Sequence, residues 1–190
     1  MTAPLRRVRV VGTSGAGKTT FARRLAAALD APHVELDEVF WGPGWTMRDA
    51  QEGRADVRAR TRTDAWVADG NWANKLGDAL DDADAVVWLD YPRRVVMARV
   101  VRRTLWRGLT RRELWHGNRE SLLNLVRRDP EENIVLWAWT SHARVRERYA
   151  ALADGPGPRV VRLTGPRAAR RWLARQAAEH ARTGGTGSPR

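Results

Sequence analysis

The chain of 190 residues contains no cysteine, only two lysines, and only two residues each of tyrosine and phenylalanine. Without cysteine it can form no disulfide, no thiolate metal site and no cysteine nucleophile. It also lacks any run of about 18 apolar residues, so the sequence predicts no membrane-spanning helix. Residues 1–5 show no signal-peptide core, and we therefore expect a cytoplasmic protein.

Arginine carries almost all of the positive charge, since Lys18 and Lys75 are the only lysines among 34 basic residues. With 22 acidic residues the net charge is +12, which favours polyanionic partners such as nucleotides or nucleic acid. Hydrophobic residues make up 43% of the chain, enough for the core of one domain. We expect a single domain over residues 1–183 and a flexible tail rich in Gly, Ser and Pro over 184–190.

Short apolar segments alternate with helical patterns along the chain. Strands are predicted at 6–11, 33–36, 65–68, 85–89 and 159–163, and helices at 19–29, 47–63 and 166–182, with a broken helical region over 93–153. This alternation predicts an α/β fold of three layers, with helices on both faces of a parallel sheet. Ligands bind such sheets at the carboxyl ends of the strands. Those ends are predicted at Gly12, Asp37, Asp69, Asp90 and Thr164.

A glycine-rich segment follows the first predicted strand and precedes the first predicted helix. It fits the pattern G-x-x-x-x-G-K-[ST] and, with the next residue, comprises Gly12, Thr13, Ser14, Gly15, Ala16, Gly17, Lys18, Thr19 and Thr20. Backbone N–H groups of such a P-loop wrap a phosphate, and the helix directs its positive end at the same anion. Lys18 would reach the β and γ phosphates of ATP, and Thr19 would offer a hydroxyl to Mg²⁺. The alternative is a glycine-rich turn with a surface lysine.

Two absences narrow the class of P-loop protein. The GTPase pattern N-K-x-D is not met, because Gly77 stands where the aspartate belongs after Asn74 and Lys75. A hydrolytic ATPase usually has a catalytic glutamate beside its Walker-B aspartate. No glutamate lies beside Asp69 or Asp90 in this sequence. The sequence therefore favours transfer to a second substrate, and a kinase needs a lid that excludes water.

A candidate lid lies in the basic region. Residues 91–150 contain 14 arginines, no lysine and six acidic residues. Guanidinium groups suit phosphoryl oxygens, so we expect a helical, arginine-rich lid over about residues 100–130. The alternative is a solvated basic helix face.

Four segments carry a family resemblance: the P-loop, residues 33–41 with L-D-x-x-F-W, residues 66–72 with D-G-N, and residues 113–120 with G-N-R-E. Together they resemble the bacterial adenylate-kinase-related P-loop proteins, some of which are named DNA topology modulation proteins. The resemblance implies the nucleoside-monophosphate-kinase fold, a five-stranded parallel sheet in the order 2-3-1-4-5, and ATP and Mg²⁺ as ligands. It leaves the acceptor open.

Candidate roles follow for the strand ends and nearby aromatic residues. Asp37 would orient the acceptor hydroxyl or act as general base, as in similar small-molecule kinases; otherwise it caps a helix. Asp69 resembles the aspartate that holds Mg²⁺ through water, with helix capping as its alternative. Asp90 is a weaker candidate for the same task. Trp41, Trp45 and Trp72 could form the wall of an acceptor pocket, or they could pack in the core; the sequence leaves both roles open.

Arginines and one loop complete the predicted site. Arg112, Arg119 and Arg144 are predicted to act in catalysis, and Arg103 and Arg148 to bind the nucleotide. Pro166 lies in a loop whose position resembles the adenine-contacting loop of these kinases, although a simple strand-to-helix turn also explains it.

Two functions fit these features. The first is an ATP-dependent kinase that transfers the γ-phosphoryl group to a small molecule, either a nucleotide or a hydroxyl compound. The second is a nucleic-acid-binding regulator that uses ATP as a switch, which the net charge supports. No helix-turn-helix, zinc-finger or RNP signature accompanies that charge, so the sequence favours the kinase. The sequence leaves the oligomeric state open.

Overall fold

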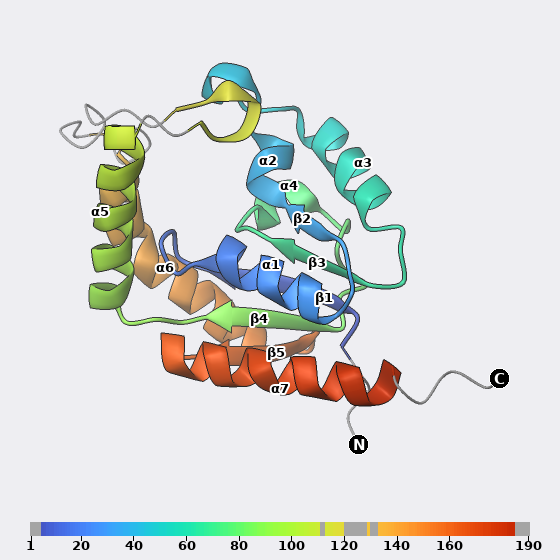
Figure 1. The fold of residues 1–190 in the computed structure, drawn as a ribbon. Helices are drawn as coiled ribbons and strands as arrows, with labels where there is room; N and C mark the ends of the chain where they lie inside the picture. The colour runs from blue at the N-terminus through green and yellow to red at the C-terminus, as the bar shows by residue number, and fades with distance from the viewer. Residues whose placement is uncertain (1–4, 111–112, 120–128, 130–132, 185–190) are drawn as a thin grey trace.

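A computed structural model describes residues 5–110, 113–119, 129 and 133–184 (Figure 1). Within these ranges no helix is both long enough and apolar enough to cross a membrane. Arg112 and the expected tail beyond Gly184 lie outside the described residues.

Five strands form one sheet, and every neighbouring pair is parallel. The strands are β1 (Arg7–Gly12), β2 (His33–Glu35), β3 (Trp66–Asp69), β4 (Ala85–Leu89) and β5 (Arg159–Leu163). Their order across the sheet is β2-β3-β1-β4-β5, which confirms the predicted topology. In this register Val10 lies beside Asp69 on one side and Val87 on the other.

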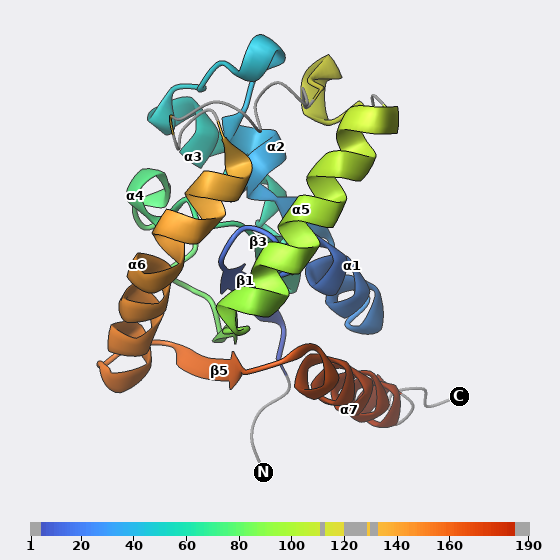
Figure 2. The ribbon, with the colours of Figure 1, turned by 90° about the vertical axis from the view of Figure 1, so that its left-hand side faces the viewer.

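Helices cover both faces of the sheet (Figures 1 and 2). They are α1 (Lys18–Ala28), α2 (Leu36–Phe40), α3 (Ala50–Arg60), α4 (Ala73–Leu76), α5 (Arg93–Thr110), α6 (Ile134–Asp154) and α7 (Pro166–Gly184), with 3-10 turns η1 (Pro43–Trp45) and η2 (Trp115–Gly117). The three layers predicted from the sequence are confirmed.

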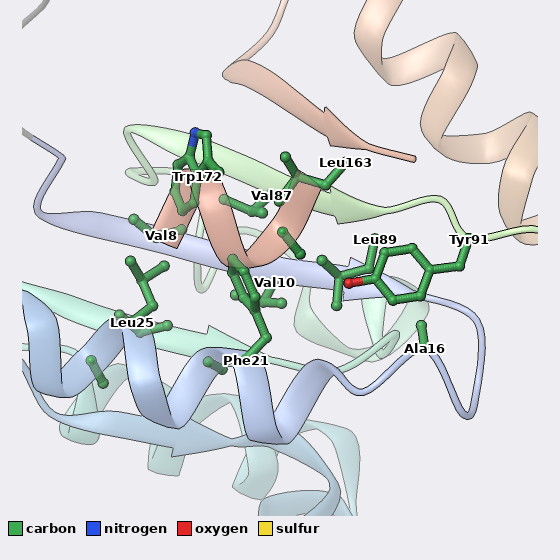
Figure 3. Close-up of a cluster of buried hydrophobic side chains, with 14 of the residues drawn as sticks. Val8, Val10, Ala16, Phe21, Leu25, Val87, Leu89, Tyr91, Leu163 and Trp172 are labelled. Carbon is green, nitrogen blue, oxygen red and sulfur yellow. The ribbon is translucent and has the colours of Figure 1, made fainter. Parts of the chain in front are cut away.

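Alternating strand residues bury their side chains on opposite faces, as the pleat requires. Val8 and Val10 of β1 pack against Phe21 and Leu25 of α1 and Trp172 of α7 (Figure 3). On the other face, Val11 and Trp88 pack with Tyr149 of α6. A separate cluster under α2, α3 and α4 surrounds Trp66. These cores hold the carboxyl ends of the strands in fixed positions.

Several boundaries differ from the sequence prediction, and two of the differences bear on the site. The second strand ends at Glu35, and Asp37 lies in the first turn of α2 instead of ending the strand. The helix predicted from residue 47 begins only at Ala50, because Asp49 caps it by accepting hydrogen bonds from the backbone N–H groups of Gln51 and Glu52. The preceding residues instead form a hairpin closed by the pair Trp41–Met47.

The basic region forms two long helices that pack against each other, α5 and α6. Between them, a second hairpin is closed by the pair Glu113–Arg119 and contains η2. This hairpin lies beside η1, far from it in sequence (Figures 1 and 2). Only part of the expected lid, residues 100–110 and 113–119 with residue 129, is therefore described.

Candidate functional site

The P-loop connects β1 to α1 through backbone conformations that glycine permits. Gly15 and Gly17 have φ values of 86° and 92°, in the left-handed region. Ala16 N–H donates to the carbonyl oxygen of Thr13 at 3.0 Å and closes the turn. The loop therefore lies at the N-terminus of α1, where anions bind.

Asn71 braces the start of this loop. Its Nδ2 donates to the carbonyl oxygen of Gly12 at 2.7 Å, and its Oδ1 accepts from Gly12 N–H at 3.3 Å. Tyr149 of α6 donates to the same Oδ1 at 3.3 Å. No role was predicted for Asn71 from the sequence, although it belongs to the D-G-N segment.

Asp69 lies at the carboxyl end of β3, with its side chain 2% exposed. Its Oδ2 accepts the hydroxyl hydrogen bond of Thr19 at 2.9 Å, and its Oδ1 lies 2.7 Å from Nε2 of His33. Hydroxyl and carboxylate oxygens are ligands that suit Mg²⁺, which takes its remaining ligands from water and phosphates. No cluster of three His, Asp or Glu residues that could hold a metal occurs in the described residues. The donors therefore fit a magnesium ion bound mainly through a nucleotide.

Lys18 and Asp37 interact electrostatically within the site. Burial lowers the pKa of the Lys18 ammonium, while the negative charges of Asp37 and Asp69 oppose that shift. Burial raises the pKa of the Asp37 carboxyl, and Lys18 and a hydrogen bond from Trp72 oppose it. Trp72 Nε1 donates to Asp37 Oδ1 at 2.7 Å. Arg103 of α5 also acts electrostatically on both groups.

Glu35 is a further carboxylate of the site that the sequence analysis missed. It ends β2, beside Asp69 in the sheet register. Burial raises the pKa of the Glu35 carboxyl, and the charge of Asp69 acts in the same direction. Polar contacts with Trp115 and Thr19 act in the opposite direction. An acidic residue near the carboxyl end of a predicted strand was the available signal.

Four half-buried tryptophans form a row of rings next to these carboxylates. Trp41 lies edge-on to Trp45 and to Trp72, with ring centroids 5.8 and 5.5 Å apart. Trp45 lies edge-on to Trp115 at 6.3 Å. All four line the same cavity, so this row is a pocket wall as well as a packing unit.

Asn118 joins the two hairpins. It is 4% exposed, its Nδ2 donates to the carbonyl oxygen of Gly42 at 2.9 Å, and its Oδ1 accepts from Trp45 N–H at 3.0 Å. His116 adds a contact of 2.9 Å to the carbonyl oxygen of Glu38. The lid side and the tryptophan side of the site are thereby connected, a link that the sequence did not indicate.

One cavity of about 1900 Å³ contains most of the predicted site residues. The predicted residues that line it are Ser14, Gly15, Ala16, Gly17, Lys18, Thr19, Thr20, Asp37, Arg103, Arg144, Arg148 and Pro166. The described ones that do not line it are Gly12, Thr13, Asp69 and Arg119. Gly12 and Asp69 still support it through the Asn71 and Thr19 contacts given above.

Several arginines differ in their surroundings. Arg148 lines the cavity and donates to Asn74 Oδ1 at 3.0 Å. Arg119 is exposed and pairs with Glu113 at 3.5 Å, within its own hairpin. Arg99, which the sequence analysis did not single out, donates to the carbonyl oxygen of Ala16 at 2.9 Å and so joins α5 to the P-loop.

Asp90 has a different environment from Asp69. Its carboxylate accepts two hydrogen bonds from Arg162 of β5, at 2.8 and 2.5 Å, and Arg146 lies 3.5 Å away. It does not line the cavity. These ion pairs explain Asp90 as a contact between β4, β5 and α6.

Comparisons with known proteins add little to this geometry. No protein-family model and no curated protein sequence matches the chain. Among solved structures the chain is similar to a gluconokinase from Sinorhizobium meliloti 1021, with 17% sequence identity and a TM-score of 0.49, over 94% of this chain and 97% of that chain. A likeness at this level carries no argument about function. The P-loop and the strand order described above are therefore the basis for assigning this chain a P-loop kinase fold.

Proposed function

We propose that this protein is an ATP-dependent kinase that transfers the γ-phosphoryl group of Mg-ATP to a small-molecule acceptor. The observation that carries the proposal is that Lys18 and Asp37 line one cavity and interact electrostatically there. A P-loop lysine marks the phosphoryl donor, and a carboxylate facing it suits an acceptor hydroxyl.

On the donor side, the P-loop backbone and Lys18 would bind the β and γ phosphates. Thr19, with Asp69 behind it, would hold Mg²⁺, which neutralises charge on the phosphates when bound. The N-terminal end of α7 at Pro166 would contact the adenine ring. Arg103 and Arg148 would bind the phosphates.

On the acceptor side, Asp37 would accept a hydrogen bond from the attacking hydroxyl and then its proton. A bond forms between that hydroxyl oxygen and the γ-phosphorus, while the bond from the γ-phosphorus to the bridging oxygen of ADP breaks. Lys18 and Arg103 would stabilise the charge that shifts to the ADP oxygen. Trp72 keeps Asp37 oriented through its indole N–H.

The lid stays part of the proposal. Arginines of α5 and α6, among them Arg144, line the cavity and would close over the phosphates. The roles predicted for Arg112 and Arg119 remain predictions. The same holds for the single domain over 1–183, the lid bounds of 100–130, the cytoplasmic location and the adenylate-kinase-related subfamily. No specific observation favours the nucleic-acid regulator, since many basic groups of this region line the cavity.

The proposal is tested by acceptor-dependent release of ADP from Mg-ATP, measured over a panel of hydroxyl compounds, nucleosides and nucleotides. Lys18→Ala should abolish release and weaken ATP binding. Asp37→Asn should lower turnover about 100-fold or more while ATP affinity stays unchanged. Unchanged turnover in Asp37→Asn would remove the proposed role of Asp37, and failure of the protein to bind Mg-ATP would remove the proposal itself.

A further inference from the structure

Part of the cavity lining consists of carboxylates and indole rings. Asp37 and Glu35 supply the carboxylates. Trp41, Trp72 and Trp115 supply three of the rings, with the edge-on geometry described above. Aromatic faces bind apolar ring faces and cations, and carboxylates bind hydrogen-bond donors.

Basic side chains are missing from one wall of this part. The described segment between β2 and β3 contributes Asp37, Trp41, Trp45 and Met47 to the cavity lining, and none of its arginines. Four of these arginines contact other groups: Arg48 reaches Val39 and Asp56, Arg54 reaches Lys75, Arg58 reaches Asp78, and Arg60 reaches Asp56 and Glu38. An anionic acceptor would therefore meet carboxylates on this wall without a cation from the same segment, while Lys18 and Arg103 act on Asp37 from the donor side.

Two indole donors beside this wall are also engaged by the protein. Trp72 Nε1 donates to Asp37, and Trp45 Nε1 donates to the carbonyl oxygen of Arg119 at 3.4 Å. The wall thus offers hydrogen-bond acceptors and ring faces. A complementary molecule must bring its own donors, either hydroxyl or ammonium groups, on a ring with an apolar face.

We propose that the acceptor, if the kinase activity above holds, is a neutral or cationic hydroxylated ring compound, of the sugar, amino-sugar or nucleoside class, that carries no phosphate or carboxylate. Discrimination follows from charge, because a phosphate or carboxylate on the ring would lie against Asp37 and Glu35. Lys75 also lines the cavity and is a cation that an anionic acceptor would need instead.

Matched pairs of acceptors test the inference. Adenosine and AMP differ by one phosphate, and glucose, glucosamine and glucuronate differ by charge on one ring. We expect kcat/KM for the neutral or cationic member to exceed that of the anionic member at least roughly tenfold. A preference for AMP or glucuronate would overturn the inference and leave the kinase proposal standing.

Variants locate the source of the discrimination. Glu35→Gln keeps the size of the side chain but removes a charge, so the ratio between neutral and anionic acceptors should fall about tenfold. Glu38→Gln is the matched control, since Glu38 pairs with Arg60 and does not line the cavity. Equal ratios in wild type and Glu35→Gln would contradict the proposed charge mechanism.

If no acceptor of the panel is phosphorylated, a binding measurement can still test the proposed acceptor class independently of phosphoryl transfer. Calorimetric titration of the protein saturated with a non-hydrolysable ATP analogue should detect adenosine or glucosamine, and weaker binding in Trp41→Ala. Such binding would support the acceptor class although the kinase proposal had failed. No binding of any neutral or cationic ring compound would overturn the inference.

Discussion

At the residue scale, Asp37 combines a functional position with an unfavourable environment. Its carboxyl is held by the indole N–H of Trp72 and faces Lys18, but burial outweighs both and raises its pKa. A charged group kept in such a place costs stability in the unbound protein. Sites built to bind a ligand commonly carry this cost.

Asp37→Asn should therefore increase the free energy of unfolding at neutral pH, by about 0.5–2 kcal/mol. Because the pKa of Asp37 is raised above its ordinary value of 3.8, its contribution to stability is complete below that value and is lost as the pH rises through the folded-state pKa. Asparagine is similar in size and can still accept from Trp72. Urea unfolding of the wild type and of Asp37→Asn from about pH 4 to about pH 8 should show a difference in the free energy of unfolding that grows with pH.

Asp49 provides a control, because its pKa is shifted in the opposite direction from that of Asp37. Backbone hydrogen bonds from Glu52 and Gln51 lower the pKa of its carboxyl. The stability that Asp49 contributes is thus present above its ordinary pKa and is lost as the pH falls through the folded-state value. Asp49→Ala should destabilise the protein at neutral pH and less in acid. Parallel pH profiles for the two variants would contradict the assignment.

Gly15 is restricted by both conformation and space. Its φ is 86°, and an added Cβ would lie 2.2 Å from Cγ2 of Val100 and 3.0 Å from the carbonyl oxygen of Val96. Gly15→Ala should cost about 1–3 kcal/mol and weaken ATP binding, because the loop and α5 cannot keep their contact. Thermal unfolding and ATP titration measure the two effects.

Gly44→Ala is the matched control for this clash. Its φ is 66°, but no atom lies within 4 Å of an added Cβ. Only the backbone cost of about 1–2 kcal/mol is then expected, with ATP affinity unchanged. If both variants lost ATP affinity equally, the close approach of α5 to the P-loop would not be the cause.

At the element scale, the two hairpins form the connection between the acceptor side and the lid side. Both have an antiparallel closing pair around a 3-10 turn, and both place a tryptophan in the contact between them. Asn118 is the buried polar group at this contact, with both of its amide atoms hydrogen-bonded across 76 and 73 residues of sequence. Opening the site would require these bonds to break.

Asn118→Ala should separate the hairpins, because it leaves Gly42 C=O and Trp45 N–H without their partner. We expect a loss of about 1–3 kcal/mol in the free energy of unfolding and faster amide exchange around residues 42–46. Hydrogen exchange and urea unfolding measure these effects.

Arg119→Ala is the neighbouring control. Arg119 is exposed and pairs only weakly with exposed Glu113, so stability and exchange should change little. Turnover of the same variant tests the catalytic role that the sequence predicted for Arg119. Fast exchange in both variants would argue against a specific role of Asn118.

At the scale of the whole molecule, the net charge of +12 predicts low-salt attraction to any polyanion. Retention on DNA should therefore fall steeply between about 50 and about 200 mM salt, without preference for sequence. Retention on immobilised duplexes at rising salt is the measurement. Sequence-specific binding that survives the higher salt would favour the nucleic-acid regulator over the kinase.

The fold was predictable because its signals are local. The glycines around Lys18 require a loop between a strand and a helix, and the runs of valine in β1 and β4 read as strands buried on both faces. The family resemblance implied the strand order that the structure confirms. The boundary at Asp37 was misplaced because α2 begins immediately after three strand residues, leaving no turn residue as a signal.

The sequence by itself determined the phosphate loop, the layers and the strand ends other than the one at Asp37, since each depends on neighbouring residues along the chain. Only the tertiary structure decided which distant side chains meet there. Glu35 became part of the site, and Asp90 became an ion-pair partner of Arg162, through packing that joins separate elements. Asn118 came to lie against Gly42 in the same way. Burial and charge at such contacts depend on the whole fold, and they set the chemistry of the pocket opposite Lys18.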